Sequence, residues 1–207
     1  MVRLIRNLLL TSLLLFSLFG QSQERKNYFP AWSFEQRDAN IHGLSFGLTS
    51  IQFNHADFQT NSNTNGVKVE AFGGLLFLLF WANSGGGVVP ESDSVFQRKN
   101  ELDPIKEKVN GVNFSLTGPF CNCRVNGFSL GTLALFNTKV NGVSFSLLNF
   151  VMEKNGIQLA LSNGSYKLNG LQLGLFNKSV KLKGIQIGLW NKNQKRSLPF
   201  INWNFKG

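Results

Sequence analysis

The sequence has few of the residues that carry catalysis or hold metal ions. Among 207 residues it contains two histidines, His42 and His55, and two cysteines, Cys121 and Cys123. It has no recognisable nucleophile, zinc-binding or phosphate-binding motif, and its acidic residues are scattered. Segment 54–57 places a histidine near a carboxylate, but adjacent residues on a loop rarely share catalytic geometry. We therefore expect a protein that is not an enzyme and that uses no cofactor.

The cysteines lie two residues apart in a Cys-Asn-Cys sequence. On a strand both side chains would point to the same face, and a disulfide between residues so close would be strained. A metal site would need further cysteine or histidine ligands at suitable spacing, which the sequence does not offer. The sequence favours two small buried apolar side chains and predicts no metal site, but it leaves open whether the thiols are free.

Long hydrophobic runs are also missing after the N-terminus. The longest, Leu75–Ala82, has eight residues, whereas a membrane-spanning helix needs about 18. At the N-terminus, two arginines precede an apolar stretch at residues 8–19, and small residues follow it. This pattern is typical of a secretory signal peptide. We expect residues 1–22 to be a signal peptide and residues 23–207 to form a single exported all-β domain.

Acidic residues are nearly absent from the second half of the chain. Residues 106–207 hold 13 basic and two acidic residues, a net charge of +11, whereas residues 23–105 hold six basic and nine acidic ones. A basic surface attracts anionic partners such as lipid headgroups or acidic polysaccharide. The alternative is that the charge only keeps an exported protein soluble.

What the sequence does contain is a tandem repeat. Six copies between residues 110 and 191 read NGVNFSLTG, NGFSLG, NGVSFSLLN, NGIQLALSN, NGLQLGLFN and KGIQIGLWN. Their glycines, 16, 15, 14, 14 and 14 residues apart, are Gly111, Gly127, Gly142, Gly156, Gly170 and Gly184. Such a period indicates small units that stack, because one unit alone cannot bury its apolar face. We expect residues 106–207 to be the tandem repeats and residues 23–105 to be an irregular β region with long loops at 54–65 and 83–103.

Within each copy, alternation of apolar and polar residues predicts β-strands. Around Gly184 the alternating apolar residues are Val180, Leu182, Ile185, Ile187 and Leu189. Asn-Gly or Lys-Gly at the centre favours a turn, a bulge or a corner, each of which puts all five on one face. The second polar position after the glycine is always small: Ser115, Gly131, Ser146, Ala160, Gly174 and Gly188. This recurrence indicates that something approaches that position closely.

One column of the repeat suggests a binding site. Three residues before the glycine, five of six copies carry a basic residue, namely Lys108, Arg124, Lys139, Lys167 and Lys181, and the sixth carries Glu153. If neighbouring copies align, these residues form a ladder of cations and a candidate anion-binding site. The alternative is a solvated polar face whose lysines prevent edge-to-edge aggregation.

Three all-β architectures fit the repeat. The preferred one is a closed antiparallel β-barrel of outer-membrane type, with one strand per repeat and the five apolar residues facing lipid. In the alternative, a β-solenoid, each repeat forms one coil and the same five residues face inward. There Asn149, Asn163, Asn177 and Asn191 would stack as a ladder at a corner. The third is a soluble meander of hairpins that would have to curl shut to cover its apolar face.

The Gly-Leu-Gln-Leu-Gly-Leu-Phe-Asn sequence at residues 170–177 resembles the repeat of uncharacterised repeat-containing surface proteins of bacteria, over roughly residues 106–207. This resemblance implies a surface location and carries no activity with it. The alternation of Ile201, Trp203 and Phe205 is also similar to the signal that closes outer-membrane barrels. The chain departs from that signal by ending in Lys206 and Gly207.

We therefore expect a non-catalytic exported envelope protein, a repetitive β scaffold embedded in or displayed at the outer membrane. The alternative is a peripheral module that binds anionic glycan or lipid headgroups with its basic ladder. The expected partner is the outer membrane or an anionic cell-surface polymer, and no nucleic acid is expected. The sequence points to no particular protein partner.

Overall fold

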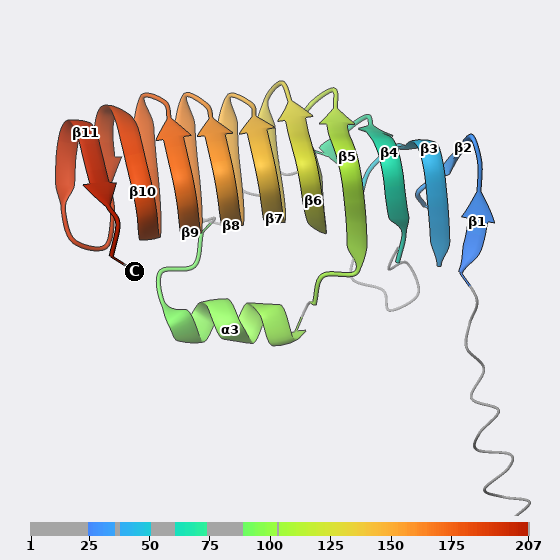
Figure 1. Ribbon diagram of the computed structural model, residues 1–207, viewed down its shortest axis with the longest axis horizontal. Coiled ribbons are helices and arrows are strands. Elements are labelled where there is room, and N and C mark those ends of the chain that lie inside the picture. Colours follow the sequence, from blue (N-terminus) through green and yellow to red (C-terminus); the bar gives the residue numbers. More distant parts are fainter. Residues whose placement is uncertain (1–24, 36–37, 51–60, 74–88, 103, 207) are drawn as a thin grey trace, which may run out of the picture.

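The computed structural model describes residues 25–35, 38–50, 61–73, 89–102 and 104–206. The expected signal peptide lies outside these residues. The strands stand side by side in one long row, with β1 at one end and β11 at the other; of the described strands, β2 alone lies off this row and pairs with β3 (Figure 1). They are β1 (Lys26–Tyr28), β2 (Ala31–Ser33), β3 (Ala39–Gly47), β4 (Asn63–Glu70), β5 (Glu107–Ser115), β6 (Phe120–Gly131), β7 (Ala134–Phe145), β8 (Leu148–Leu159), β9 (Ser162–Leu173), β10 (Phe176–Lys192) and β11 (Ser197–Asn204).

Successive repeats pair in register. From β3 to β10 every pair of neighbouring strands is parallel, and the central glycines pair with one another, for example Gly142 with Gly156 and Gly170 with Gly184. Each repeat therefore completes one coil and returns to the same position one strand further along. The fold is a β-solenoid with one repeat per coil, as in the alternative expectation.

The preferred β-barrel is wrong. A closed antiparallel barrel needs neighbouring strands to run in opposite directions and its first strand to pair with its last. Here the strands from β3 to β10 are parallel, and β1 and β11, at the two ends of the row, do not pair with each other. The hairpin meander fails for the same reason. In the described part of the chain, β11 alone runs antiparallel to its neighbour, covering the edge of β10. Alternation and a short period cannot tell a hairpin from a coil, because both bring equivalent residues side by side.

The corner of each coil lies at the repeated glycine. In β3 to β10 these glycines have φ angles between +118° and +148°, a region that other residues rarely adopt. A Cβ atom on Gly156 would collide with the carbonyl oxygen of Gly142, the corner glycine of the preceding coil. The sequence allowed a turn, a bulge or a corner at the glycine, and the chain forms the corner.

The interior differs from the one expected for a solenoid. Leu182 faces inward and is buried, but Ile185, Ile187 and Leu189 face outward. Gln186, which lies between Ile185 and Ile187, is fully buried, and so are its equivalents Gln158 and Gln172. Gln172 Nε2 donates to Gln158 Oε1 at 3.0 Å, and Gln186 Nε2 donates to Gln172 Oε1 at 2.7 Å. An amide that bonds to its equivalents in the neighbouring coils can be buried at little cost. Gln186 is the last glutamine of the column, and its Oε1 has no hydrogen-bond partner.

The outward positions after the corner form a second surface, which we call the apolar face. It comprises the first and third residues after each glycine of β3 to β10: Leu44, Val67, Val112, Phe128, Val143, Ile157, Leu171, Ile185, Phe46, Val69, Phe114, Leu130, Phe145, Leu159, Leu173 and Ile187. All of them are partly or largely exposed. The solenoid expectation placed the apolar residues of the repeats in the interior, whereas the preferred barrel had them facing lipid; in the structure they lie on the outside of a solenoid.

Three of the four residues of the expected asparagine ladder bond to one another at the other corner, whereas Asn149 Nδ2 donates to Ser144 Oγ at 3.1 Å instead. Asn163 Nδ2 donates to Asn177 Oδ1 at 2.8 Å, and Asn177 Nδ2 donates to Asn191 Oδ1 at 2.7 Å. This ladder also explains the column of small residues. A Cβ atom on Gly188 would lie 2.6 Å from Asn177 Nδ2 and would collide with the carbonyl oxygen of Gly174. The close approach predicted from the sequence is made by the chain itself.

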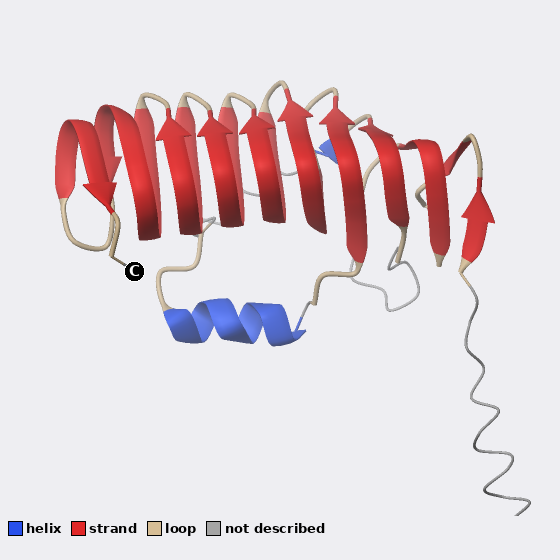
Figure 2. Cartoon of the chain, in the orientation of Figure 1, coloured by secondary structure: helices blue, strands red, loops and turns tan. Residues whose placement is uncertain are grey.

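Helix α3 (Asp93–Leu102) lies beside the row of strands (Figure 2). Its one buried residue, Phe96, stacks on Tyr166 with ring centroids 4.2 Å apart, and both belong to a cluster with Ala134 and Met152. The sequence predicted a loop at 83–103, because a single buried side chain gives no helical periodicity. Of the other expected loop, residues 54–60 lie outside the described residues and Asn63 begins β4. Within the described residues, no helix is long and apolar enough to cross a membrane.

Candidate anion-binding edge

The basic residues of the repeat align in one column, as predicted, and Glu153 interrupts it between Lys139 and Lys167. Lys108 pairs with Arg124, Arg124 with Lys139, and Lys139 with Glu153, which pairs in turn with Lys167. Lys167 then pairs with Lys181 at the next coil. We call Lys108, Arg124, Lys139, Lys167 and Lys181 the basic column. It runs along the corner edge of the solenoid, next to the repeated asparagines.

Ion pairs within the column neutralise part of its charge. Glu153 lies 2.8 Å from Lys139 Nζ and 3.6 Å from Lys167 Nζ, and both pairs are partly exposed. Partial burial opposes ionisation of Glu153. The hydrogen bond and charge of Lys139, with the charge of Lys167, outweigh it and hold the pKa of Glu153 below its usual range. One carboxylate therefore holds the two middle lysines of the column.

The C-terminal end of the column is engaged by α3. Lys181 Nζ lies 2.6 Å from a carboxylate oxygen of Asp93, which also accepts a hydrogen bond from the Tyr166 hydroxyl. The hydrogen bonds from Lys181 and Tyr166 lower the pKa of Asp93. Burial, together with Asp93, raises the pKa of Tyr166 to about 12. Asp93 thus joins the helix to the column and fixes the position of Lys181.

The N-terminal end of the column is less occupied. Among the described residues, neither Lys108 nor Arg124 makes an ion pair, and Arg124 Nε is buried without a hydrogen-bond partner. A guanidinium group offers planar donors that suit carboxylate, sulfate or phosphate oxygens. These two residues are therefore available to an anionic ligand.

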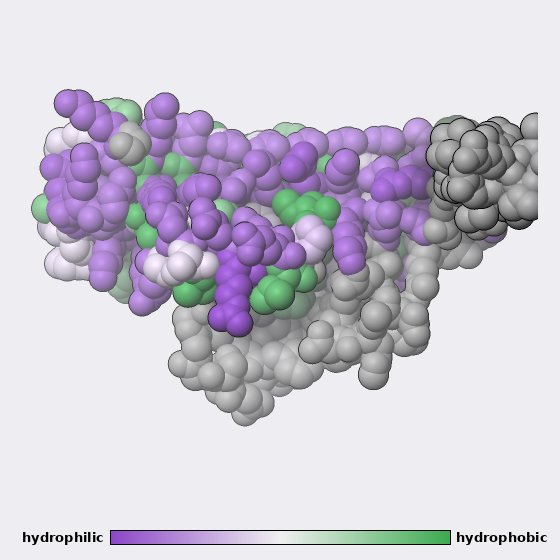
Figure 3. Space-filling model, turned by 90° about the horizontal axis from the view of Figure 1, so that it is seen from below, coloured by the Kyte–Doolittle hydropathy of each residue, from purple (hydrophilic) through white to green (hydrophobic). Residues whose placement is uncertain are grey.

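A groove of about 650 Å³ runs beside the C-terminal half of the column. It is lined by Lys139, Glu153, Lys154, Asn155, Lys167, Leu168, Asn169, Val180, Lys181, Leu182, Lys183 and Gln194. Five of these residues are lysines and one is acidic, so the groove is rich in amine donors. Viewed from below, this edge of the molecule is mainly hydrophilic, with smaller hydrophobic areas beside it (Figure 3).

Lys154 is the least expected residue of the groove. It occupies the inward column that holds Val140, Leu168 and Leu182 in other coils, and its side chain is 1% exposed. Its Nζ donates to the carbonyl oxygen of Gly142 at 2.8 Å, and no acidic residue pairs with it among the described residues. Burial alone lowers the pKa of Lys154 to about 7.

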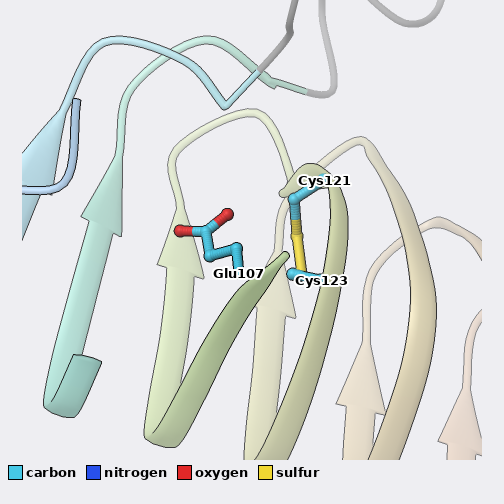
Figure 4. Close-up of side chains that lie close together, drawn as sticks. All are labelled: Glu107, Cys121 and Cys123. Carbon is cyan, nitrogen blue, oxygen red and sulfur yellow. A yellow bond between two sulfur atoms is a disulfide. The ribbon is translucent and has the colours of Figure 1, made fainter. Parts of the chain in front are cut away.

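Cys121 and Cys123 are joined by a disulfide at the start of β6 (Figure 4). Both point inward and are buried in an apolar cluster with Val109 and Val125, as the sequence indicated, but they are not the unlinked side chains that it favoured. Glu107 lies beside them, and one ligand atom of each residue lies within 4.8 Å of the other two. The Glu107 carboxylate is already 2.6 Å from Lys68 Nζ, and the two sulfur atoms are bonded to each other. The group as it stands offers little to a metal ion.

Sequence reasoning found the basic column and missed most of what surrounds it. The groove residues Lys154 and Lys183 and the contact from Asp93 were not expected. Lys154 carried a usable signal, because it is the one charged residue in a column of valine and leucine. Asp93 carried none, because it is more than 80 residues away in sequence from Lys181. His42 is exposed on β3, and His55 lies outside the described residues.

Comparison with known proteins gives no relative. No protein-family model matches the chain, and neither the curated proteins nor the solved structures contain a significant match to it.

Proposed function

We propose that this chain is a non-catalytic exported envelope protein whose solenoid binds anionic groups at the cell surface through its basic edge. The observation that supports the proposal best is the in-register basic column with its lysine-lined groove. Neighbouring strands are spaced about 4.8 Å apart, so the column presents a cation on each strand from β5 to β10 except β8, which carries Glu153. Such an array suits a repetitive anionic surface better than a single small molecule.

The chemistry of the edge favours binding over catalysis. Its side chains are amines, a guanidinium and amides, which donate hydrogen bonds and carry positive charge. The expected ligand groups are carboxylate, sulfate or phosphate, held on a glycan or a lipid headgroup. The resemblance of the repeat to bacterial surface proteins and the expected signal peptide support an envelope location. The proposal includes no cofactor, no metal ion and no nucleic acid.

Removal of three positive charges from the column tests this function. We expect the triple variant Lys139→Gln, Lys167→Gln, Lys181→Gln to bind dextran sulfate at least about tenfold more weakly than the unchanged protein, because three cationic contacts are lost. The matched control is Lys106→Gln, Lys192→Gln, Lys195→Gln, which removes the same charge outside the column. Binding is measured by titration at two salt concentrations, with circular dichroism to verify folding. If both variants lost the same affinity for dextran sulfate, the loss would be due to net charge alone, and a specific site would be refuted.

Removing the acidic member of the column should have the opposite effect. Glu153 holds Lys139 and Lys167. We expect Glu153→Gln to strengthen binding of dextran sulfate by roughly three- to tenfold, because both lysines become available and a repulsive charge disappears. Uncharged dextran serves as the control ligand. Unchanged or weaker binding of dextran sulfate by this variant would show that the middle of the column does not contact the polymer.

A further inference from the structure

The proposed role of the basic edge does not explain why the apolar face is exposed. Its side chains are substantially exposed: Phe128 is 50%, Phe145 is 53% and Ile187 is 42% exposed. Helix α3 does not cover this face. Its Phe96 packs on Tyr166, which precedes Gly170 and therefore lies on the other half of the coil. Exposed apolar side chains scattered singly need no explanation, but these stand in unbroken columns.

The size of the face indicates an interaction surface. Eight coils at about 4.8 Å make it about 38 Å long, and its columns with the leucines that follow them, such as Leu161 and Leu189, make it about 13 Å wide. The area is about 500 Å², close to the largest apolar patches found on monomeric proteins, which are often functional. The face continues onto β11, where Ile201 pairs with Ile187 and Trp203 pairs with Ile185. Parallel sheets are usually covered on both sides.

The charge beside the apolar face favours a lipid bilayer over a second copy of the chain as its partner. The repeats carry a net charge of +11, and the basic column with Lys183 follows the corner edge that borders the face. In a face-to-face pair of chains, the sheets would pack about 10 Å apart, bringing two strongly basic edges within about one Debye length. A bilayer with anionic headgroups instead accepts apolar side chains at its acyl boundary and attracts the lysines beside them.

Aromatic residues at one end of the face agree with this choice. Trp190, Phe200, Trp203 and Phe205 are all exposed around β11. Tryptophan favours the membrane interface, where its ring is apolar and its N–H group remains hydrated. The exposed lysine side chains of the edge are long enough to reach phosphate groups while the apolar columns lie deeper.

We propose that the apolar face docks on the surface of an anionic lipid bilayer, with the solenoid lying flat on the membrane. The inference rests on the proposed function in one respect, since it names lipid headgroups as the source of the anionic groups. The apolar contact itself is independent of the basic column. The side chains enter the headgroup region to a depth of about 5–10 Å, and no segment of the sheet crosses the bilayer.

Vesicle flotation tests the proposal. Purified protein is floated with vesicles of phosphatidylcholine alone and with vesicles that contain one-third phosphatidylglycerol, at low and high salt. We expect binding to the anionic vesicles that persists in part at high salt. The variant Phe128→Asn, Phe145→Asn, Ile187→Asn should bind at least about 30-fold more weakly, because three inserted side chains lose their apolar contact. The control Val95→Asn, Leu102→Asn changes exposed apolar residues on α3 and should bind within twofold of the unchanged protein.

A second measurement uses the unchanged protein and so does not depend on how a variant folds. Quenching of tryptophan fluorescence by brominated lipid should occur on anionic vesicles, because Trp203 lies on the continuation of the face. Absence of quenching, with vesicle binding intact, would overturn the inference. So would vesicle binding that high salt abolishes and the face variant leaves unchanged, a result that would still support the proposed function.

Two other outcomes separate the two proposals. Binding of dextran sulfate without binding to any vesicle would overturn the docking of the face and retain the proposed function. A dimer that the face variant dissociates, without lipid binding, would assign the face to a second copy of the chain and also overturn the inference. Salt-resistant vesicle binding without any binding of dextran sulfate would support the inference and refute the role of the basic column.

Discussion

Replacement of Gly156 by alanine should cost about 4 kcal/mol or more of the free energy of unfolding and is expected to prevent stable folding. Gly156 has a φ of +118°, which an alanine adopts only with strain. Its new Cβ atom would collide with the carbonyl oxygen of Gly142, and neither backbone can move away, because both belong to the same stack of in-register coils. In a repeat protein each coil contacts only its neighbours, so a fault in the middle separates the two halves.

The adjacent residue provides the control. Asn155 is exposed and donates one hydrogen bond, at 2.8 Å, to Asn141 in the preceding coil. We expect Asn155→Ala to cost about 1 kcal/mol or less, since water replaces an exposed partner. Thermal and denaturant unfolding measure both variants. If Gly156→Ala cost no more than Asn155→Ala, the corner geometry described above would be incorrect.

Replacement of Lys154 by leucine should stabilise the protein by about 3 kcal/mol at neutral pH. The pKa of Lys154 in the folded protein is about 7, against an ordinary value of 10.5, so the folded state favours the neutral amine. This difference corresponds to a cost of roughly 4–5 kcal/mol at and below neutral pH. Loss of the hydrogen bond to Gly142 offsets about 1 kcal/mol of the gain. Leucine already occupies this column at positions 168 and 182.

The pH dependence tests the cause of this gain. Because the folded pKa lies below the unfolded one, the penalty is complete below pH 7 and disappears as the pH rises from about 7 towards 10.5. The unchanged protein should therefore become more stable over this interval, and Lys154→Leu should lose that rise. We expect a difference in Tm of roughly 6–12 °C at pH 7, shrinking at pH 10. Lys183→Leu, an exposed lysine on the same edge, should show neither effect; equal gains in both variants would exclude burial as the cause.

The repeat spacing alone predicted much of the architecture. Equal steps of fourteen residues between Gly142, Gly156, Gly170 and Gly184 require in-register units, and the asparagine ladder followed from the same spacing. The direction of neighbouring strands could not be predicted, because alternation has the same period in a hairpin and in a coil. The repeat alone therefore could not separate the barrel from the solenoid.

The choice of interior failed for a different physical reason. Apolar side chains such as Ile187 are ordinarily assigned to the core and glutamines such as Gln186 to the surface. In this narrow coil the rule reverses after the corner, because each inward amide can bond to its equivalent in the next coil at 2.7–3.0 Å. A single repeat cannot reveal this bond, which exists only between copies. A column that is glutamine in three successive coils was the available signal.

The sequence predicted that the residues of the candidate site align, but it did not predict the ion pairs that they form. The spacing placed Lys139, Glu153 and Lys167 in one column, which the pairing confirms. It could not show that Glu153 holds both lysines or that α3 delivers Asp93 to Lys181. Those contacts depend on side-chain conformation and on a segment outside the repeats. The ligand of the column stays a prediction.

Because the central glycines pair in every coil from β3 to β10, the solenoid can lengthen or shorten by whole coils. Insertion or deletion of one fourteen-residue unit would change the solenoid by about 4.8 Å and leave every other coil with the same two neighbours. Each added unit would extend the apolar face and the basic edge together. Gene duplication within the repeat could therefore adjust avidity for a surface in small, equal increments while the ends of the chain, including β11, keep their sequence.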